Sequence, residues 1–342
     1  MNMLTRLCRA LACTALTAAG AHAADRCASQ ASALSRQACL LPATAALQDR
    51  MARDLARASK SLSADGARKL RASQQAWRRF VDQSCDESSG STASGQDEGN
   101  CVVNALYARI TELAQVGLHA GPFVLTRVDR YDITPAPVPA NVSPEWRVLP
   151  LRSQIGYPKI DGTASQEALD WNRDQEQHGT SEEDGRPSDE YIGYVVGCAS
   201  DRLLSLQVVR YQFSQGAAHG TSEFEVRNYV VGQALRAMTP DDLFAPASGW
   251  EDTLPDLVWQ VYLDRGGKYA DDPKFEANVR AAATEPDHWL LTPRGLEISF
   301  SSYEAGCYAC GPGPLTVPWP QLAPMLANKA TLACETGAKG PG

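Results

Sequence analysis

A polar segment between two cysteines most constrains how the first third of this chain can fold. Residues 86–100 lie between Cys85 and Cys101 and contain no apolar side chain larger than that of Ala93. Such a segment cannot join a hydrophobic core, because it has almost no apolar surface to remove from water. Apolar residues recur at helical spacing on both sides of it. We therefore expect a solvent-exposed loop between two helices.

Three amphipathic segments predict a small all-helical N-terminal domain. Their apolar residues recur three, four or seven positions apart, which places each set on one face of a helix. The sets are Leu47, Met51 and Leu55; Leu70, Trp77 and Val81; and Leu106, Ile110 and Leu113. We expect Trp77 and Phe80 in the core. Asp82 and Arg109 are suited to a structural ion pair between two of the helices.

The N-terminus has the pattern of a secretory signal peptide, residues 1–24. Arg6 and Arg9 precede a short apolar run at residues 10–19, and small residues follow as far as Ala24. This run is too short for a transmembrane helix, and no other run is long enough, so we expect no membrane span. A lipoprotein signal at Cys13 is disfavoured, because almost no apolar segment precedes that cysteine.

The remaining cysteines predict disulfides. An even number of cysteines in an exported chain indicates an oxidising compartment, so we expect a periplasmic or secreted protein. The chain has ten cysteines, and those beyond the signal peptide are Cys27, Cys39, Cys85, Cys101, Cys198, Cys307, Cys310 and Cys334. The first four of these allow three connectivities, and spacing alone does not choose among them.

The pattern changes after a proline-rich stretch. Pro135, Pro137, Pro139 and Pro144 predict an extended linker, which we place at residues 121–145. An α+β domain with a mainly antiparallel sheet is expected at residues 146–330, before a tail at 331–342. Apolar patterns predict strands at 191–196, 203–213, 223–231 and 296–300, and helices at 165–174, 254–264 and 273–283. Residues 174–190 contain seven acidic residues and predict a solvated insertion.

The charge is concentrated in the second part of the chain. Residues 121–342 carry 30 Asp and Glu residues against 18 Lys and Arg residues. Such a surface disfavours nucleic acid as a ligand and would attract a cationic protein. Glu182, Glu183 and Asp184 are candidate contacts for a basic partner. The alternative is that the acidic residues only keep the protein in solution.

The first half resembles the LprI-like family of lysozyme inhibitors. The residues that carry the resemblance are Gln74, Trp77, Phe80, Asp82 and Cys85, followed by Cys101, Arg109 and Leu113. The resemblance covers residues 25–120 and implies two helices joined by a loop that a Cys85–Cys101 disulfide restrains. Cys27 and Cys39 would then pair locally. The small polar residues of the loop are candidate binding residues: Ser88, Ser89, Gly90, Ser91 and Ser94.

The second half resembles the extracellular domain of the anti-sigma factor RsiV, a family that includes a lysozyme receptor. Short motifs occur in the family's order: 157–160, 203–206, 216–220, 239–244, Tyr303-Glu304, 311–312 and 317–319. This chain differs by an additional alanine before His219 and by Cys307 and Cys310. Tyr303 and Tyr308 are candidate binding residues. The cytoplasmic segment and membrane helix of RsiV have no counterpart here, so an anti-sigma role is not implied.

The sequence predicts no catalytic or metal centre. His219 is the best-placed acid or base, but no nucleophile elbow of the Gly-x-Ser-x-Gly type accompanies it, and a structural role is favoured. The histidines are isolated and form no His-Glu-x-x-His pattern. Cys307 and Cys310 have the spacing of a redox pair, but the following Gly-Pro-Gly-Pro excludes a helix that would activate a thiol. We favour a structural disulfide over metal binding or redox activity.

The leading interpretation is an exported, non-catalytic cell-envelope protein that binds and inhibits lysozyme-type muramidases without a cofactor. An inhibitor must block a cleft in which two carboxylates do the chemistry, and a tethered polar loop is suited to that task. The alternative is an accessory protein that binds or modifies peptidoglycan. Bound zinc, or turnover of cell-wall fragments, would favour that alternative.

Overall fold

The computed structural model describes residues 27–86, 95–135, 150–162, 165–178, 188–214 and 217–327. The chain forms two compact units, and each is described by itself. The first unit comprises Met1–Leu55 and Gln75–Ile110, and the second comprises Ala56–Gln74 and Thr111–Gly342. The expected signal peptide and the C-terminal tail lie outside the described residues, and the domain boundaries expected from the sequence stay predictions.

The N-terminal part of the chain is helical, as expected. It contains α2 (Ala33–Leu40), α3 (Pro42–Lys60), α4 (Ala64–Cys85) and α5 (Gly95–Ala114). Most of the predicted residues at helical spacing in the first unit are buried, because they form apolar stripes, and Trp77 is 2% exposed. Leu47 and Leu55 are only partly buried. Phe80 is only half-buried. Disulfides join Cys27 to Cys39 and Cys85 to Cys101, which confirms the pairing that the resemblance implied.

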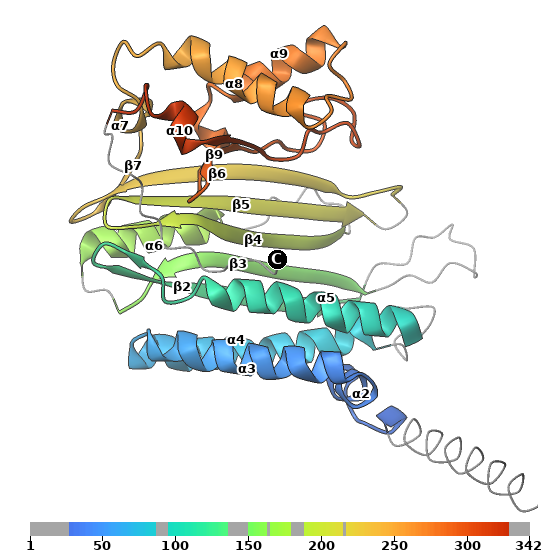
Figure 1. Ribbon diagram of the computed structural model, residues 1–342. Helices are drawn as coiled ribbons and strands as arrows, with labels where there is room; N and C mark the ends of the chain where they lie inside the picture. Colours follow the sequence, from blue (N-terminus) through green and yellow to red (C-terminus); the bar gives the residue numbers. More distant parts are fainter. Residues whose placement is uncertain are drawn as a thin grey trace, which may run out of the picture. The chain divides into compact units, whose positions relative to one another are not determined.

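The second unit contains a seven-stranded sheet in the order β1-β2-β3-β4-β5-β6-β7 (Figure 1). Its strands are β1 (His119–Ala120), β2 (Phe123–Thr134), β3 (Leu151–Ile160), β4 (Ser188–Ala199), β5 (Leu203–Ser214), β6 (Thr221–Val231) and β7 (Leu235–Ala237). Each neighbouring pair is antiparallel except β3 and β4, which are parallel. A parallel pair needs a crossover, and α6 (Gln166–His178) supplies it. The expected α+β fold with a mainly antiparallel sheet is confirmed.

Strand β5 shows how the large sheet separates two cores. Successive side chains of a strand point to opposite faces. Leu204 and Leu206 belong to a core with Trp171 of α6. Leu203 belongs to a second core, and the Ser205 hydroxyl accepts a hydrogen bond from the backbone N–H of Leu291 on that side (3.0 Å).

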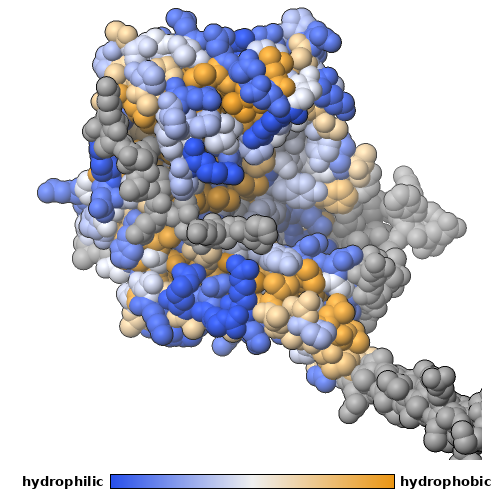
Figure 2. All heavy atoms as spheres, viewed as in Figure 1, coloured by the Kyte–Doolittle hydropathy of each residue, from blue (hydrophilic) through white to orange (hydrophobic). Residues whose placement is uncertain are grey.

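A small sheet and two helices build the second core. The strands are β8 (Trp289–Leu291), β9 (Gly295–Ile298) and β10 (Leu315–Pro318), and the helices are α8 (Trp250–Asp264) and α9 (Pro273–Ala282). Short helices α7 (Pro240–Leu243), η2 (Pro286–His288) and α10 (Trp319–Leu322) lie in the connections. Figure 1 shows α8 and α9 as one layer over the small sheet. Hydrophobic and hydrophilic residues are interspersed over this layer (Figure 2), as is usual for a helical surface in water.

Three segments differ from the sequence-based expectation. The solvent-exposed loop expected at residues 86–100 is shorter, because α5 begins at Gly95, and Glu98 within that helix is buried. Residues 123–134, placed in the linker, form β2 because Phe123 and Leu125 anchor the strand in a core. The insertion expected at 174–190 is shorter, because α6 continues to His178 and β4 begins at Ser188. Among the described helices, none has both the length and the apolar character that crossing a membrane requires.

Candidate functional site

The base of a tethered loop in the first unit is the first candidate site. Cys85 is the last residue of α4, and its disulfide to Cys101 joins that helix to α5. The disulfide closes a loop of the chain around residues 87–94. The predicted binding residues Ser88, Ser89, Gly90, Ser91 and Ser94 lie outside the described residues and stay predictions. What the structure describes is the way in which the two ends of this loop are held.

Arg36 of α2 links those two ends. Its Nη2 donates to Oδ1 of Asp86 (3.2 Å), directly before the segment. Its Nε and Nη2 donate to the two oxygens of Glu98 (3.2 and 3.3 Å), shortly after the segment. The hydrogen bond to Glu98 raises the pKa of the Arg36 guanidinium above its ordinary value, although burial acts in the opposite direction. The guanidinium therefore forms a second, non-covalent link across the loop.

Helix α2, which carries Arg36, is fixed by further contacts within the first unit. The Cys27–Cys39 disulfide closes the segment around it. The backbone N–H of Leu34 donates to Oδ1 of Asp82 (3.1 Å), and Gln37 donates to the same Glu98 oxygen that Arg36 contacts (3.2 Å). Asp82 is thus a structural residue of the first unit. Arg109 is fully buried, and its expected ion pair with Asp82 stays a prediction.

Sequence analysis did not identify Arg36 or Glu98. The two residues are 62 positions apart and belong to no common pattern of spacing. Charged residues are common at surface positions, so neither side chain stands out in the sequence. Only the folded structure brings the two side chains together. One signal was available in the sequence. Glu98 lies in a polar segment that has no large apolar residue, and a charged residue that becomes buried there needs a partner.

An exposed aromatic cluster in the second unit is the second candidate site. We define it as His219, Tyr303 and Tyr308. The Tyr308 ring stacks on the His219 ring, with centroids 3.7 Å apart and an interplanar angle of 14°. The Tyr303 hydroxyl lies 3.1 Å from Nε2 of His219. The tyrosines are 53% and 39% exposed, and clustered exposed aromatic side chains are enriched at binding interfaces. The structure thus brings both predicted tyrosines to the predicted structural histidine.

The segment that carries these tyrosines is fixed to β6. The backbone N–H of Ser302 donates to the carbonyl of Ser222 (2.8 Å), and the N–H of Ser222 donates to the Ser302 hydroxyl (3.0 Å). A disulfide joins Cys307 to Cys310 on either side of Tyr308. The segment is not at a helix N-terminus, so a structural disulfide fits better than a reactive thiol pair.

The structure describes few of the remaining predicted residues. Cys198 is also disulfide-bonded, whereas Cys334 lies outside the described residues. Glu182, Glu183 and Asp184 likewise lie outside them and stay predictions. The second unit nevertheless has two further polar features that bear on its stability, a pocket and a buried ion cluster.

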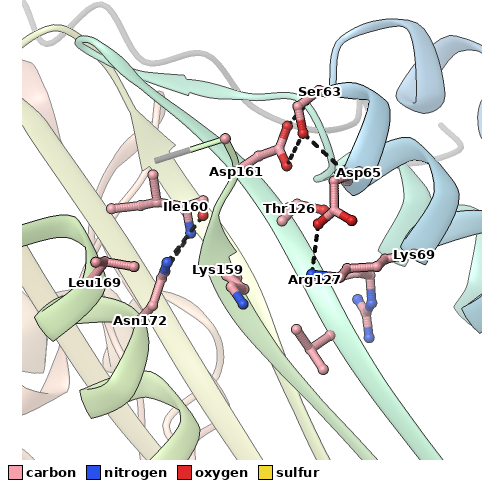
Figure 3. Close-up of a pocket in the computed structure, with 13 residues that line it drawn as sticks. Ser63, Asp65, Lys69, Thr126, Arg127, Lys159, Ile160, Asp161, Leu169 and Asn172 are labelled. Atoms are coloured by element: carbon pink, nitrogen blue, oxygen red, sulfur yellow. Dashed lines mark hydrogen bonds and ion pairs between the residues drawn. The ribbon is translucent and has the colours of Figure 1, made fainter. Parts of the chain in front are cut away.

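A pocket of about 220 Å³ lies where α4 begins, beside β2, β3 and α6 (Figure 3). The Asp161 carboxylate accepts hydrogen bonds from the backbone N–H of Ser63 (2.5 Å) and from its hydroxyl (2.9 Å). The Ser63 hydroxyl in turn accepts the N–H of Gly66 (3.1 Å), and Asp65 pairs with Lys69 (2.7 Å). These contacts cap the start of α4. We therefore assign these polar side chains a structural role.

Arg127 forms a buried ion cluster inside the second unit. Its Nε donates to Oδ1 of Asp129 (2.6 Å), and its Nη2 lies 3.3 Å from Oε1 of Glu112. The side chains of Arg127 and Asp129 are 2% and 1% exposed. Ser73 and Gln154 donate hydrogen bonds to the two carboxylates (2.6 and 3.1 Å). One guanidinium faces two carboxylates that also accept hydrogen bonds from neighbouring side chains, and we assign this cluster to the architecture of the unit.

Family models match two separate parts of the chain. Residues 24–113 match the family model described as "Lysozyme inhibitor LprI", and residues 241–320 match "Protein of unknown function (DUF3298)". The chain joins an LprI domain to a DUF3298 domain. The Arg36 link belongs to the LprI domain, and both tyrosines of the aromatic cluster belong to the DUF3298 domain. The LprI match suggests lysozyme inhibition, whereas the DUF3298 description assigns no function.

Solved structures of DUF3298 family proteins are similar to part of the chain. One from Pseudomonas aeruginosa PAO1 is 17% identical with a TM-score of 0.40, and covers 60% of this chain and 95% of its own. One from Bacteroides fragilis NCTC 9343 is 15% identical with a TM-score of 0.42, and covers 62% and 96%. No curated protein matches the chain. The connection to a function therefore comes from the LprI family model.

Proposed function

We propose that this protein is an exported, non-catalytic binder and inhibitor of lysozyme-type muramidases. The observation that carries the proposal is the LprI match over residues 24–113, which contain the whole base of the tethered loop. The disulfides support an extracellular or periplasmic location, because such bonds persist in oxidising compartments. The acidic composition of the second half supports attraction to a cationic partner.

The proposed mechanism is occlusion of the muramidase cleft by the loop around residues 87–94. That cleft contains the two carboxylates of glycoside hydrolysis, and an inhibitor that fills it keeps the substrate away from them. A loop that is ordered before binding loses less conformational entropy when it binds. Here the Cys85–Cys101 disulfide and the contacts of Arg36 with Asp86 and Glu98 hold the two ends of the segment together.

The test is a lysis assay with the whole mature, oxidised chain. The two parts of the chain should not be tested as separate fragments cut within the expected linker near residue 131, because that cut would fall inside β2. We would measure lysis of cell walls by lysozymes of several classes, with the wild type and a Cys85→Ser/Cys101→Ser variant. Arg50→Met, which changes a partly exposed side chain of the same unit, is the control. We expect stoichiometric inhibition that falls at least tenfold in the first variant only.

Two outcomes would contradict the proposal in different ways. Unchanged inhibition by a folded Cys85→Ser/Cys101→Ser variant would exclude the loop mechanism but retain the inhibitor function. A lack of binding to lysozymes of every class would remove the function itself. Peptidoglycan binding would then become the leading candidate, which the exposed aromatic cluster favours, and sedimentation with purified peptidoglycan would test it.

A further inference from the structure

One side of helix α4 carries a row of exposed arginine side chains, which we call the arginine stripe. Its members are Arg68, Arg71, Arg78 and Arg79. Separations of three, seven and eleven residues return to the same side of a helix. Because α4 is one uninterrupted helix, this spacing follows from helix geometry alone (Figure 1). At 1.5 Å per residue, the stripe is about 16 Å long.

The protein itself neutralises little of this charge. Among the residues that the structure describes, Arg68 pairs with Asp65, and the guanidinium groups of the other three arginines form no ion pair or hydrogen bond. The second acidic residue of α4, Asp82, accepts the backbone N–H of Leu34 (3.1 Å). The whole chain has a net charge of -8, so the stripe is a cationic surface on an acidic protein. Such a surface attracts an anionic partner.

The other side chains of α4 indicate what kind of partner this is. Leu70, Trp77 and Val81 are buried, so the apolar face of the helix is already occupied. The exposed residues between the arginines are Ala72 and Gln75. Protein interfaces depend on large, mostly aromatic anchor residues, and this stripe offers none. Short neutral residues instead allow a row of guanidinium groups to approach a flat surface.

We propose that the arginine stripe binds the phosphate groups of anionic phospholipids, so that the protein associates with a membrane surface through α4. A guanidinium binds phosphate oxygens through two parallel N–H···O hydrogen bonds. Lipid headgroups diffuse laterally, so each arginine of a fixed row meets a phosphate without a matching pocket. Clustered basic residues on an amphipathic helix are typical of binding to anionic lipids, and each one strengthens that binding about fivefold.

The contact is peripheral, and the charge distribution gives it a direction. Residues 121–342 carry 30 Asp and Glu residues against 18 Lys and Arg residues, and anionic headgroups repel such a surface. The arginine stripe is therefore the side that faces the lipid. This inference goes beyond lysozyme inhibition and does not depend on it, because α4 meets the membrane whether or not the protein inhibits a muramidase.

The experiment is sedimentation of the whole mature, oxidised chain with lipid vesicles. Vesicles of phosphatidylcholine alone are compared with vesicles that also contain phosphatidylglycerol. We expect binding to the anionic vesicles only, and weaker binding at high salt because exposed charges are screened. Arg71→Gln/Arg78→Gln/Arg79→Gln removes the three guanidinium groups that have no partner among the described residues, and should weaken binding at least tenfold.

A second triple variant separates the stripe from the net charge. Arg173→Gln/Arg265→Gln/Arg294→Gln removes the same positive charge from exposed side chains of the second unit. It should bind the anionic vesicles as the wild type does, because the stripe is intact. All six side chains are exposed, so circular dichroism should show that both variants remain folded.

Three results would overturn the proposal. The first is a wild type that does not bind anionic vesicles at low salt, or binds phosphatidylcholine vesicles equally well. The second is binding that the two triple variants lose or retain to the same extent, since the net charge or another surface would then be responsible. The third is binding of soluble polyphosphate as tight as that of vesicles at equal phosphate concentration. A soluble polyanion, and not a membrane, would then be the ligand.

Discussion

The guanidinium of Arg36 donates two hydrogen bonds to the carboxylate of Glu98 and a third to Asp86, so one side chain holds both ends of the polar loop. Hydrogen bonds to charged groups contribute about 1.5–3 kcal/mol when they are partly buried. We expect Arg36→Met to lower the free energy of unfolding by about 2 kcal/mol. Muramidase inhibition should fall several-fold, because the non-covalent link between the two ends of the loop is lost.

Urea unfolding and the lysis assay would measure these two effects. Arg50→Met is the matched control in the same unit, because Arg50 makes only an exposed contact with Asp54 (3.8 Å). Its stability should stay within about 0.5 kcal/mol of the wild type. Full inhibition by a folded Arg36→Met variant would show that the disulfide alone orders the loop.

A second prediction concerns the acid stability of the DUF3298 domain. Arg236 donates hydrogen bonds to both oxygens of Asp242 (2.7 and 3.0 Å), and the backbone N–H of Thr239 adds another (2.8 Å). The Arg236 bond holds the pKa of Asp242 well below its ordinary value, against a smaller opposing effect of burial. The carboxylate therefore stabilises the fold above its unfolded pKa of about 3.9, and this contribution decreases as the pH falls further.

We expect Asp242→Asn to lower the free energy of unfolding at pH 7 by about 1 kcal/mol. The difference from the wild type should narrow progressively below about pH 4, where the wild type begins to lose the same contribution. Urea unfolding at pH 7 and pH 3 would measure it. Asp241→Asn, which changes an exposed neighbour, should show no such pH dependence. An equal difference in the free energy of unfolding at pH 7 and pH 3 would contradict the stabilising role assigned to the Asp242 carboxylate.

Removal of the buried arginine should have a larger effect. Arg127→Met leaves the carboxylates of Asp129 and Glu112 buried beside an apolar chain, and breaking a buried ion cluster in this way costs about 3–5 kcal/mol. Arg130→Met is the control, because its contact with Glu176 is exposed, and it should cost less than about 1 kcal/mol. Equal unfolding midpoints for the two variants would show that the cluster is not a stabilising feature.

The aromatic cluster leads to a prediction about binding alone. Tyr308→Ala removes the ring that stacks on His219, but Tyr308 belongs to neither hydrophobic core of the second unit, so the melting temperature should fall only slightly. If the cluster contacts the partner, affinity should fall about tenfold, as for a central aromatic residue of an interface. Surface plasmon resonance with an immobilised lysozyme would measure it. Leu263→Ala, at another exposed position of the second unit, is the control and should bind lysozyme as the wild type does. Equal affinities of the two variants would show that the aromatic cluster does not contact lysozyme.

Local patterns of apolar residues predicted the helices and strands in which they occur. The spacing of Trp77 and Val81 in α4 reflects one helix face packing on a core, and the pattern of β5 reflects a strand with a core on each face. The pairing of Cys27 with Cys39 and of Cys85 with Cys101 came from the family resemblance, with which their short separations in the chain agree. Contacts between residues far apart in the chain were not predictable. Tyr303 and His219 are 84 positions apart, and no spacing rule relates them. Strand β2 was missed because the prolines after it dominated the pattern.

The serines that fix the aromatic segment also close the edge of the large sheet. Strand β7 pairs with β6 at Tyr229–Val231, and among the described strands none pairs with the first part of β6 on that side. An unpaired edge is a template for another chain. Ser301 and Ser302 occupy it by accepting the backbone N–H groups of Phe224 and Ser222. The segment therefore protects the folded protein against edge-to-edge aggregation, whatever its aromatic side chains bind.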